Sequence, residues 1–362
     1  MGETLEVVGA GPAGLAAAIA LARAGCRVRV HEAQLEVGHR FGADLQGLEN
    51  WTASGDVLES LRKSGIEARF EACPCRRGVA FDAWDRAYEL AGKAPLVYVI
   101  ARGPRQGSLD RGLLEQALAL GVEVRFGSRR QGVAGTAVSA TGPRTTDAIA
   151  AGYHFETALP DGFWIVLDDA LAPQGYAYLL VMHGRGTVKS CMFGDFARHR
   201  VYAERSAERF RRLVGLRMSN PSYHAAGAAL GGAPVAPGGP GLAAGEQAGW
   251  QDALTGFGLR YAMRSGLLAA RAVLEGSDYA AACRRELLPV REAACVNRAL
   301  YARLGNRGYR MLLRAHGWRG DSSAFLRWLY RPSAARRLLA ALFAGGLLKR
   351  PGPRAGSGAW RS

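Results

Sequence analysis

Short apolar runs alternate with glycine-rich and helical segments over the first thirty residues. Leu5–Val8 and residues 27–31 have the apolar content of strands, and residues 15–25 (LAAAIALARAG) have that of a helix. A G-x-G-x-x-G sequence (GAGPAG, 9–14) separates the first strand from the helix, and the second strand is followed by Glu32. This order of strand, glycine turn, helix, strand and acidic residue is typical of a dinucleotide-binding unit.

Each residue of this unit has a physical role toward a nucleotide cofactor. Gly9 permits the tight turn, Gly11 lets the backbone approach a pyrophosphate, and Gly14 allows the helix to pack closely on the strand. Amide groups at the helix N-terminus face the phosphate charge. Glu32 is expected to accept hydrogen bonds from ribose hydroxyls, which favours FAD or NAD over NADP. The unit alone leaves FAD and NAD as alternatives.

Two stretches in the middle of the chain, 152–169 and 173–193, have alternating aromatic and β-branched residues with glycine turns between them. They predict an antiparallel sheet that covers a ligand site. Candidate substrate-pocket residues on it are Trp164, Tyr176 and Tyr178, with ordinary core packing as the alternative for each. The pattern after Tyr279 is helical.

The chain has 49% hydrophobic and 22% charged residues, a composition typical of globular proteins, and a net charge of +16. Its length of 362 residues exceeds the usual size of one domain. Residues 276–362 hold 17 basic and only 4 acidic side chains. Within them, Leu338–Leu348 is an apolar run flanked by basic pairs, too short to span a bilayer. It predicts either an interfacial helix on anionic headgroups or a helix that packs over the substrate domain. No nucleic-acid motif accompanies this charge, so nucleic acid is not an expected partner.

The remaining chemistry is sparse. Six cysteines in a long chain with no recognisable secretory leader predict reduced thiols and a cytoplasmic location, with membrane association left open. The histidines are scattered singly, so no metal site is expected. Neither a G-x-S-x-G elbow nor a Walker loop is found in the sequence. The sequence singles out no catalytic acid or base.

Three segments together resemble the FAD-dependent oxidoreductases of the geranylgeranyl reductase family, within the p-hydroxybenzoate hydroxylase-like fold. They are the N-terminal unit, residues 99–124 (VIARGPRQGSLDRGLLEQALALGVEV) and residues 244–266 (AGEQAGWQDALTGFGLRYAMRSG). In that family the third segment returns to the cofactor along the ribityl chain and the flavin ring. The resemblance therefore implies FAD as cofactor, NAD(P)H as electron donor and reduction of carbon–carbon double bonds in an apolar substrate, for example an isoprenoid.

The resemblance also implies a set of cofactor-binding residues. They are Gly9, Gly11, Pro12, Ala13, Gly14, Glu32, Ala33, Arg102, Gly245, Glu246, Asp252, Thr255, Gly256, Phe257 and Gly258. The chain departs from the family pattern where Glu246 replaces an aspartate and Phe257 a glutamate, and residues 36–51 lack the cysteine that many members carry. Two alternatives stay open: an FAD-dependent monooxygenase or halogenase acting on a small aromatic substrate, and a degenerate flavin-binding protein at a membrane surface.

The expected fold is α/β, and α+β overall, with a Rossmann-like FAD-binding domain, an antiparallel substrate domain and a helical C-terminal region. The FAD-binding domain is predicted to be discontinuous, from residues 1–62, 96–150 and 233–275. Residues 63–95 and 151–232 are assigned to the substrate domain, 276–350 to the basic helical region, and 351–362 to a disordered tail.

Overall fold

The computed structural model describes residues 3–52, 55–130, 135–143, 145–230, 241–317 and 321–347. These residues form parallel and antiparallel sheets with helices on both sides, which confirms the predicted fold class. The predicted tail at 351–362 lies outside the described residues. The predicted division into domains stays a prediction.

The first sheet is wholly parallel and contains the N-terminal unit. In spatial order its strands are β15 (Leu242–Ala243), β9 (Thr136–Ser139), β1 (Leu5–Val8), β2 (Val28–His31) and β8 (Glu123–Arg125). The carboxyl ends of parallel strands meet at one edge, where α/β folds bind their ligands. Gly9, Glu32, Ala140 and Ala244 each directly follow a strand, so this edge gathers residues far apart in the sequence.

Helix α1 (Pro12–Arg23) packs against α3 (Leu109–Ala119) and α5 (Leu259–Glu275). Glycines make this close packing feasible. A Cβ on Gly14 would lie 1.9 Å from the carbonyl oxygen of Gly9, and one on Gly266 would lie 2.1 Å from that of Ala13. The first and third sequence segments are therefore in direct contact. The short α2 (Val57–Lys63) begins after Asp56, whose carboxylate accepts hydrogen bonds from two amides of its first turn.

The largest sheet carries the predicted antiparallel strands. In spatial order it contains β14 (Ser219–Ala228), β10 (Ala148–Glu156), β13 (Arg185–Met192), β12 (Tyr176–Met182), β11 (Gly162–Leu167), β5 (Arg77–Asp82) and β6 (Ala87–Ala91). All neighbouring strands are antiparallel except β11 and β5. Helix α4 (His199–Val214) covers one face, where Phe210 packs in the core with β-strand residues such as Val166 and Leu179.

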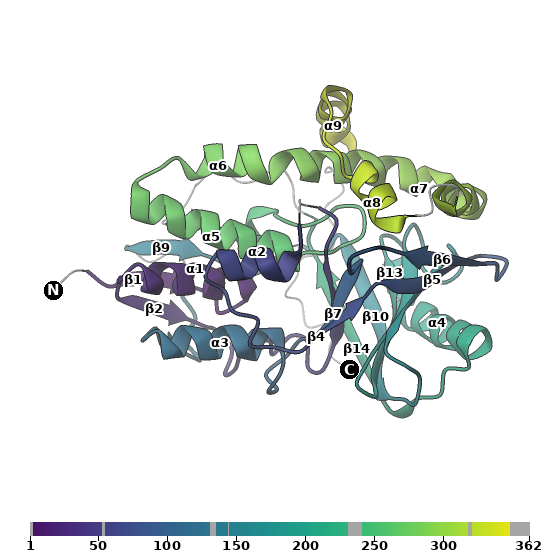
Figure 1. The fold of residues 1–362 in the computed structure, drawn as a ribbon, viewed down its shortest axis with the longest axis horizontal. Helices are drawn as coiled ribbons and strands as arrows, with labels where there is room; N and C mark the ends of the chain where they lie inside the picture. The colour runs from purple at the N-terminus through teal and green to yellow at the C-terminus, as the bar shows by residue number, and fades with distance from the viewer. Residues whose placement is uncertain are drawn as a thin grey trace.

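A third sheet of β3 (Leu45–Glu49), β7 (Val97–Ala101) and β4 (Ala72–Cys75) adjoins the large one. Short 3-10 turns lie at Phe196–Arg198 and Gly245–Ala248. The C-terminal helices are α6 (Tyr279–Glu286), α7 (Leu288–Gly317), α8 (Ser322–Leu329) and α9 (Ala334–Leu347). Figure 1 shows α6 and α7 extending along one side of the molecule and α9 projecting from it.

Helix α7 is broken once along its length. Gly305 has φ 57° and ψ −176°, a backbone conformation that is rare for any residue with a side chain. Tyr301 and Tyr309, on the two sides of the break, stack with ring centroids 4.3 Å apart. Among the described residues, no helix has the length and hydropathy needed to cross a membrane.

Candidate functional site

A cavity of about 1030 Å³ runs from the ligand edge of the parallel sheet, past the largest sheet, to helices α7 and α8. One end is lined by the glycine turn after β1, the start of α1 and the loop after β2. The other end is lined by apolar side chains of β11, β12, α7 and α8. Residues from all three sequence segments therefore share one elongated space.

The glycine turn forms the wall at the nucleotide end. Gly9 has φ 100°, and a Cβ there would lie 2.2 Å from the carbonyl oxygen of Ala140. Gly11 has an ordinary extended conformation, and a Cβ there would meet no atom within 4 Å among the described residues. This open side of Gly11 faces the cavity at the N-terminus of α1. The turn therefore offers both the space and the helix-terminal amides that a pyrophosphate requires.

Glu32 and Arg102 lie at the same end of the cavity. The Glu32 carboxylate accepts hydrogen bonds from the amides of Ala10 (2.7 Å) and Gln34 (2.9 Å), so it holds the glycine turn against the end of β2. The Arg102 guanidinium forms a buried two-point ion pair with Asp110 (2.8 and 2.9 Å). Its orientation is thus fixed before any ligand binds.

The segment around Gly245 reaches the nucleotide end from the other side. Gly245 has φ 69°, and its amide donates to the Ser265 hydroxyl (2.9 Å). A Cβ on Gly245 would lie 2.9 Å from the Cβ of Ala13, so the two glycine-rich segments touch. The Glu246 carboxylate accepts from the Ala229 amide (2.7 Å) and lies 3.4 Å from the Arg40 guanidinium.

The loop that precedes α5, at residues 253–258, is held by hydrogen bonds to the side chain of Asp252. Its buried carboxylate accepts hydrogen bonds from the amides of Leu254 (3.0 Å) and Thr255 (3.2 Å) and from the Tyr330 hydroxyl (2.7 Å). Burial raises the pKa of Asp252. From the large sheet, the Tyr176 hydroxyl donates to the carbonyl oxygen of Thr255 (2.6 Å). Two elements distant in sequence therefore fix the shape of this loop.

Most of the predicted cofactor residues line the cavity. Those that do are Gly9, Gly11, Pro12, Ala13, Glu32, Ala33, Arg102, Gly245, Glu246, Thr255, Gly256, Phe257 and Gly258. The two that do not are Gly14, which packs α1 on the glycine turn, and Asp252, which supports the loop from beneath. The sequence therefore identifies one group of neighbouring residues, although their contacts with a cofactor stay a prediction.

The three candidate substrate-pocket residues divide between the two faces of the large sheet. Tyr176 and Tyr178 line the cavity, but Trp164 does not. Trp164 packs on the opposite face, in the core that includes Phe210 of α4. Successive strand residues point to opposite faces, so its neighbours Phe163 and Ile165 line the cavity instead.

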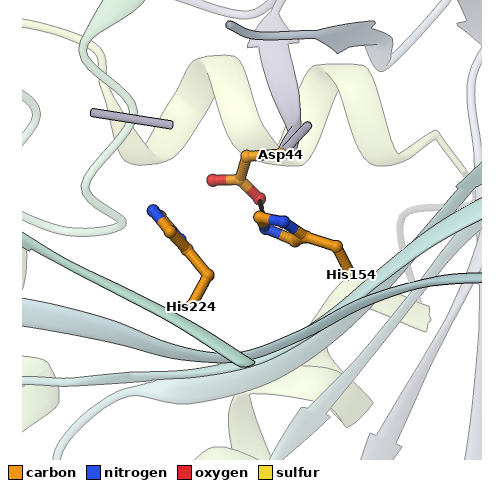
Figure 2. A group of neighbouring side chains, drawn as sticks. All are labelled: Asp44, His154 and His224. Atoms are coloured by element: carbon orange, nitrogen blue, oxygen red, sulfur yellow. Dashed lines mark hydrogen bonds and ion pairs between the residues drawn. The ribbon is translucent and has the colours of Figure 1, made fainter. Parts of the chain in front are cut away.

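Sequence reasoning missed a buried charged cluster beside the cavity. Figure 2 shows Asp44, which lines the cavity, with His154 and His224 from adjacent strands. The ammonium of Lys189 lies 2.8 Å from Oδ2 of Asp44 and 3.0 Å from Nδ1 of His224, and His154 Nε2 lies 3.1 Å from Oδ1 of Asp44. The four residues belong to separate segments with no shared motif, so only the fold brings them together.

Electrostatics explain how this cluster is satisfied. Burial raises the pKa of Asp44, but the charges of Lys189 and His154 outweigh that effect and hold the pKa well below its usual range. Burial also lowers the pKa of His224 to about 4, so its ring is neutral near pH 7. Asp44, His154 and His224 have the ligand types of a metal site. The Lys189 ammonium already bonds both Asp44 and His224, so a metal ion would have to displace it.

Cys191 is a second residue that the sequence did not single out. It lies on β13, is buried, and lines the cavity near Tyr176 and Gly256. Burial raises the pKa of its thiol to about 11, so the sulfur is protonated near pH 7. All six cysteines are free, in agreement with the predicted reduced state.

Comparison with known proteins finds a family match over the N-terminal part of this site. Residues 2–148 match the family described as FAD binding domain. The matched residues are thus similar to an FAD binding domain, and they include Gly11 and the ends of β1, β2 and β9. A comparison with curated proteins finds no match.

Solved structures extend the similarity to nearly the whole chain. A geranylgeranyl bacteriochlorophyll reductase-like protein from Thermoplasma acidophilum has a TM-score of 0.71 at 18% identity, covering 96% of this chain and 98% of that one. The flavin-dependent brominase Bmp2 has a TM-score of 0.59 at 16% identity, covering 90% of this chain and 98% of that one. The p-nitrophenol 4-monooxygenase PnpA from Pseudomonas putida DLL-E4 has a TM-score of 0.58 at 16% identity, covering 94% of this chain and 98% of that one. The fold is therefore of the p-hydroxybenzoate hydroxylase type, as the sequence resemblance implies, and it is shared by proteins with different reactions.

Proposed function

We propose that this protein is an FAD-dependent oxidoreductase that reduces carbon–carbon double bonds of an apolar substrate. The observation that carries the proposal is the division of the cavity into two chemically different ends. Among the described residues, the lining from β11, β12, α7 and α8 includes no Asp, Glu, Lys or Arg side chain. The charged lining residues lie on other elements, among them Glu32 after β2, Arg102 after β7 and Asp44 before β3. Such a lining favours an apolar substrate over a charged one.

The residues present fit FAD at the nucleotide end. The turn at Gly9–Gly14 and the first amides of α1 would hold the diphosphate, Glu32 the ribose, and the loop at Thr255–Gly258 the flavin ring. When bound, FAD supplies hydride transfer, and NAD(P)H is the proposed electron donor.

The chain's own contribution is positioning and exclusion of water. Asp252, Tyr176 and Tyr330 fix the loop before α5, and the apolar end holds the substrate away from solvent. The N-terminus of α5 lies at the cavity wall, because Gly258 and Leu259 both line it. Its helix dipole favours negative charge at this part of the cavity.

The decisive experiment is the mass of the product. We expect the purified protein to retain FAD and, after reduction without oxygen, to convert a long-chain alkenol to a product that gains two hydrogens, as measured by mass spectrometry. Fully saturated and aromatic compounds of similar size serve as controls. Under air and with bromide or chloride added, a product that gains one oxygen or one halogen atom would instead establish the second candidate, a monooxygenase or halogenase, whose fold the chain also shares. A protein that cannot be loaded with FAD would contradict both and leave a degenerate binding protein.

We also propose that the protein associates peripherally with a membrane and that α9 contacts the membrane surface. Leu338 and Leu342 of this helix are 66% and 68% exposed, whereas Ala340 is buried where α9 packs on α7. Arg327, Arg331 and Arg337 are exposed on the same C-terminal helices and their connections. Apolar and basic side chains together suit a surface of anionic lipids, where each basic residue adds about 1 kcal/mol.

We expect the protein to float with vesicles of phosphatidylcholine and phosphatidylglycerol, and to float poorly with phosphatidylcholine alone. The double variant Leu338→Ser/Leu342→Ser should lose most of this binding, because the buried apolar area is removed. The matched control is Leu118→Ser on α3, a leucine that is 48% exposed on a different element. Equal flotation of the double variant and the wild type would contradict the membrane proposal.

A further inference from the structure

We propose that His316 anchors the substrate at the apolar end of the cavity by donating a hydrogen bond to a neutral oxygen atom of that substrate. This inference rests on the proposed apolar substrate and adds a polar terminus to it. The oxygen can belong to a ketone, an ether or an alcohol, and it sits at the end of the molecule away from the FAD-binding edge.

His316 lies near the end of α7 and lines the cavity while being only 5% exposed. Its Nε2 atom lies 2.6 Å from the Ser322 hydroxyl, and its ring meets Phe325 edge to face with centroids 5.4 Å apart. Within the part of the chain that the structure describes, Nδ1 of His316 is buried without a hydrogen-bond partner. A buried polar atom without a partner is costly, and His316 lines a ligand cavity, so a ligand atom reached by a small rotation of the ring is the missing partner in this proposal.

The hydrogen bonds around Ser322 determine which ring nitrogen carries the proton. The Ser322 oxygen accepts a hydrogen bond from the Ala91 amide (2.8 Å), and its hydroxyl proton has His316 Nε2 as the nearby acceptor. When the hydroxyl donates to Nε2, the proton of the neutral ring resides on Nδ1. The opposite tautomer would leave the hydroxyl proton without an acceptor among the described residues. Burial lowers the pKa of His316, which agrees with a neutral ring. Nδ1 is therefore a hydrogen-bond donor.

The surroundings of Nδ1 select the chemistry of its partner. Leu312, Leu313 and Phe325 line the cavity next to His316, with no charged side chain among the described lining residues of this end. An ammonium group would find only neutral hydroxyl acceptors and no counter-charge here, and a carboxylate would likewise be desolvated without a counter-charge. A water molecule needs two to four polar partners. The Tyr301 and Tyr330 hydroxyls that also line this end already donate to Gly175 and Asp252.

The test compares ligands that differ only at one end. Full-length, FAD-loaded protein is titrated with 2-undecanone, undecane and undecylammonium, and binding is followed by displacement of a neutral apolar fluorescent dye. The measured quantity is the ratio of the dissociation constants of alkane and ketone, which cancels most of the difference in apolar burial. We expect this ratio to fall about tenfold in His316→Phe, which removes the donor and keeps an aromatic ring. Undecylammonium should bind more weakly than the ketone in the wild type.

Two further variants distinguish a hydrogen bond from a change in cavity shape. In His316→Asn the side-chain amide can place a donor near the position of Nδ1, so the ratio should recover part of its wild-type value. Ser322→Ala frees the ring tautomer, so the ratio should lie between wild type and His316→Phe. The control is His183→Phe, a histidine whose side chain is 58% exposed at a turn outside the cavity.

An unchanged ratio in His316→Phe with FAD still bound would overturn the anchor. If that variant does not fold, an unchanged ratio in Ser322→Ala would do so. The readout is binding, so it is independent of the reaction. If His316→Phe loses the ketone preference and the wild type reduces no double bond, the anchor is supported and the proposed reaction is refuted. If His316→Phe keeps the ketone preference and the wild type does reduce double bonds, only the anchor is refuted.

Discussion

The variant Lys189→Met is expected to lower the free energy of unfolding by about 3–5 kcal/mol. The Lys189 side chain is fully buried, and Asp44, 2.8 Å away, is 2% exposed. Removing the ammonium leaves a desolvated carboxylate whose remaining side-chain partners are His154 and Gln46, while methionine preserves the apolar volume of the side chain. Urea denaturation of the FAD-free protein measures this change in free energy. An m-value equal to that of the wild type would show that the variant exposes the same surface on unfolding.

A double variant separates the lost charge from lost packing. Asp44→Asn combined with Lys189→Met removes both charges, so it should recover a large part of the stability that Lys189→Met loses. The control is Arg62→Met, because the Arg62–Glu59 pair has a similar distance of 2.8 Å but side chains that are 68% and 43% exposed. It should change the unfolding free energy far less than Lys189→Met does, because solvent screens an exposed pair. A similar small effect for Lys189→Met would show that the cluster does not depend on its ammonium.

The variant Gly11→Val is expected to weaken FAD binding at least about 100-fold, which corresponds to about 3 kcal/mol, while the free protein folds normally. A Cβ on Gly11 would meet no described atom within 4 Å, and the backbone there is in the extended region that valine accepts. The added side chain would instead occupy the space beside the first amides of α1. Flavin fluorescence quenching measures binding, and thermal unfolding without cofactor measures stability.

Gly194 supplies the matched control for that experiment. It also has open space around its Cβ position, and it does not line the cavity. Gly194→Val should retain both FAD binding and stability. Undiminished FAD binding by Gly11→Val would place the diphosphate elsewhere, and a large loss of stability would show that the turn itself does not tolerate the side chain.

The nucleotide end of the site was predictable because local chemistry dictates it. Gly9 and Gly245 need positive φ, and Gly14 and Gly266 permit backbone contacts that any side chain would block, so glycine spacing in the sequence carries three-dimensional information. The strand, turn, helix and strand of the first unit followed from the same signals, whereas the return of the third segment to the cofactor was implied by the family resemblance.

The substrate end was less predictable because packing, and not local conformation, decides it. In β11, the choice between Trp164 and its neighbours depends on which face of the sheet α4 covers, and a period of two residues gives no preference for either face. The link between Asp44 and Lys189 joins residues 145 positions apart. His316 has only one signal in the sequence, a histidine close to the end of an apolar helix, which does not distinguish a ligand group from a packed core residue.

The break at Gly305 separates two tasks within one helix. Residues before it pack beside the loop that precedes α5, where Arg298 donates to the carbonyl oxygen of Leu254 (3.2 Å), whereas residues after it include Leu312, Leu313 and His316, which line the cavity. Because regular helical geometry is interrupted there, the segment beyond position 305 does not continue the helical register of the segment before it, and the Tyr301–Tyr309 stack joins the two. Chimeras joined at this glycine should therefore inherit chain-length preference from one parent and redox behaviour from the other.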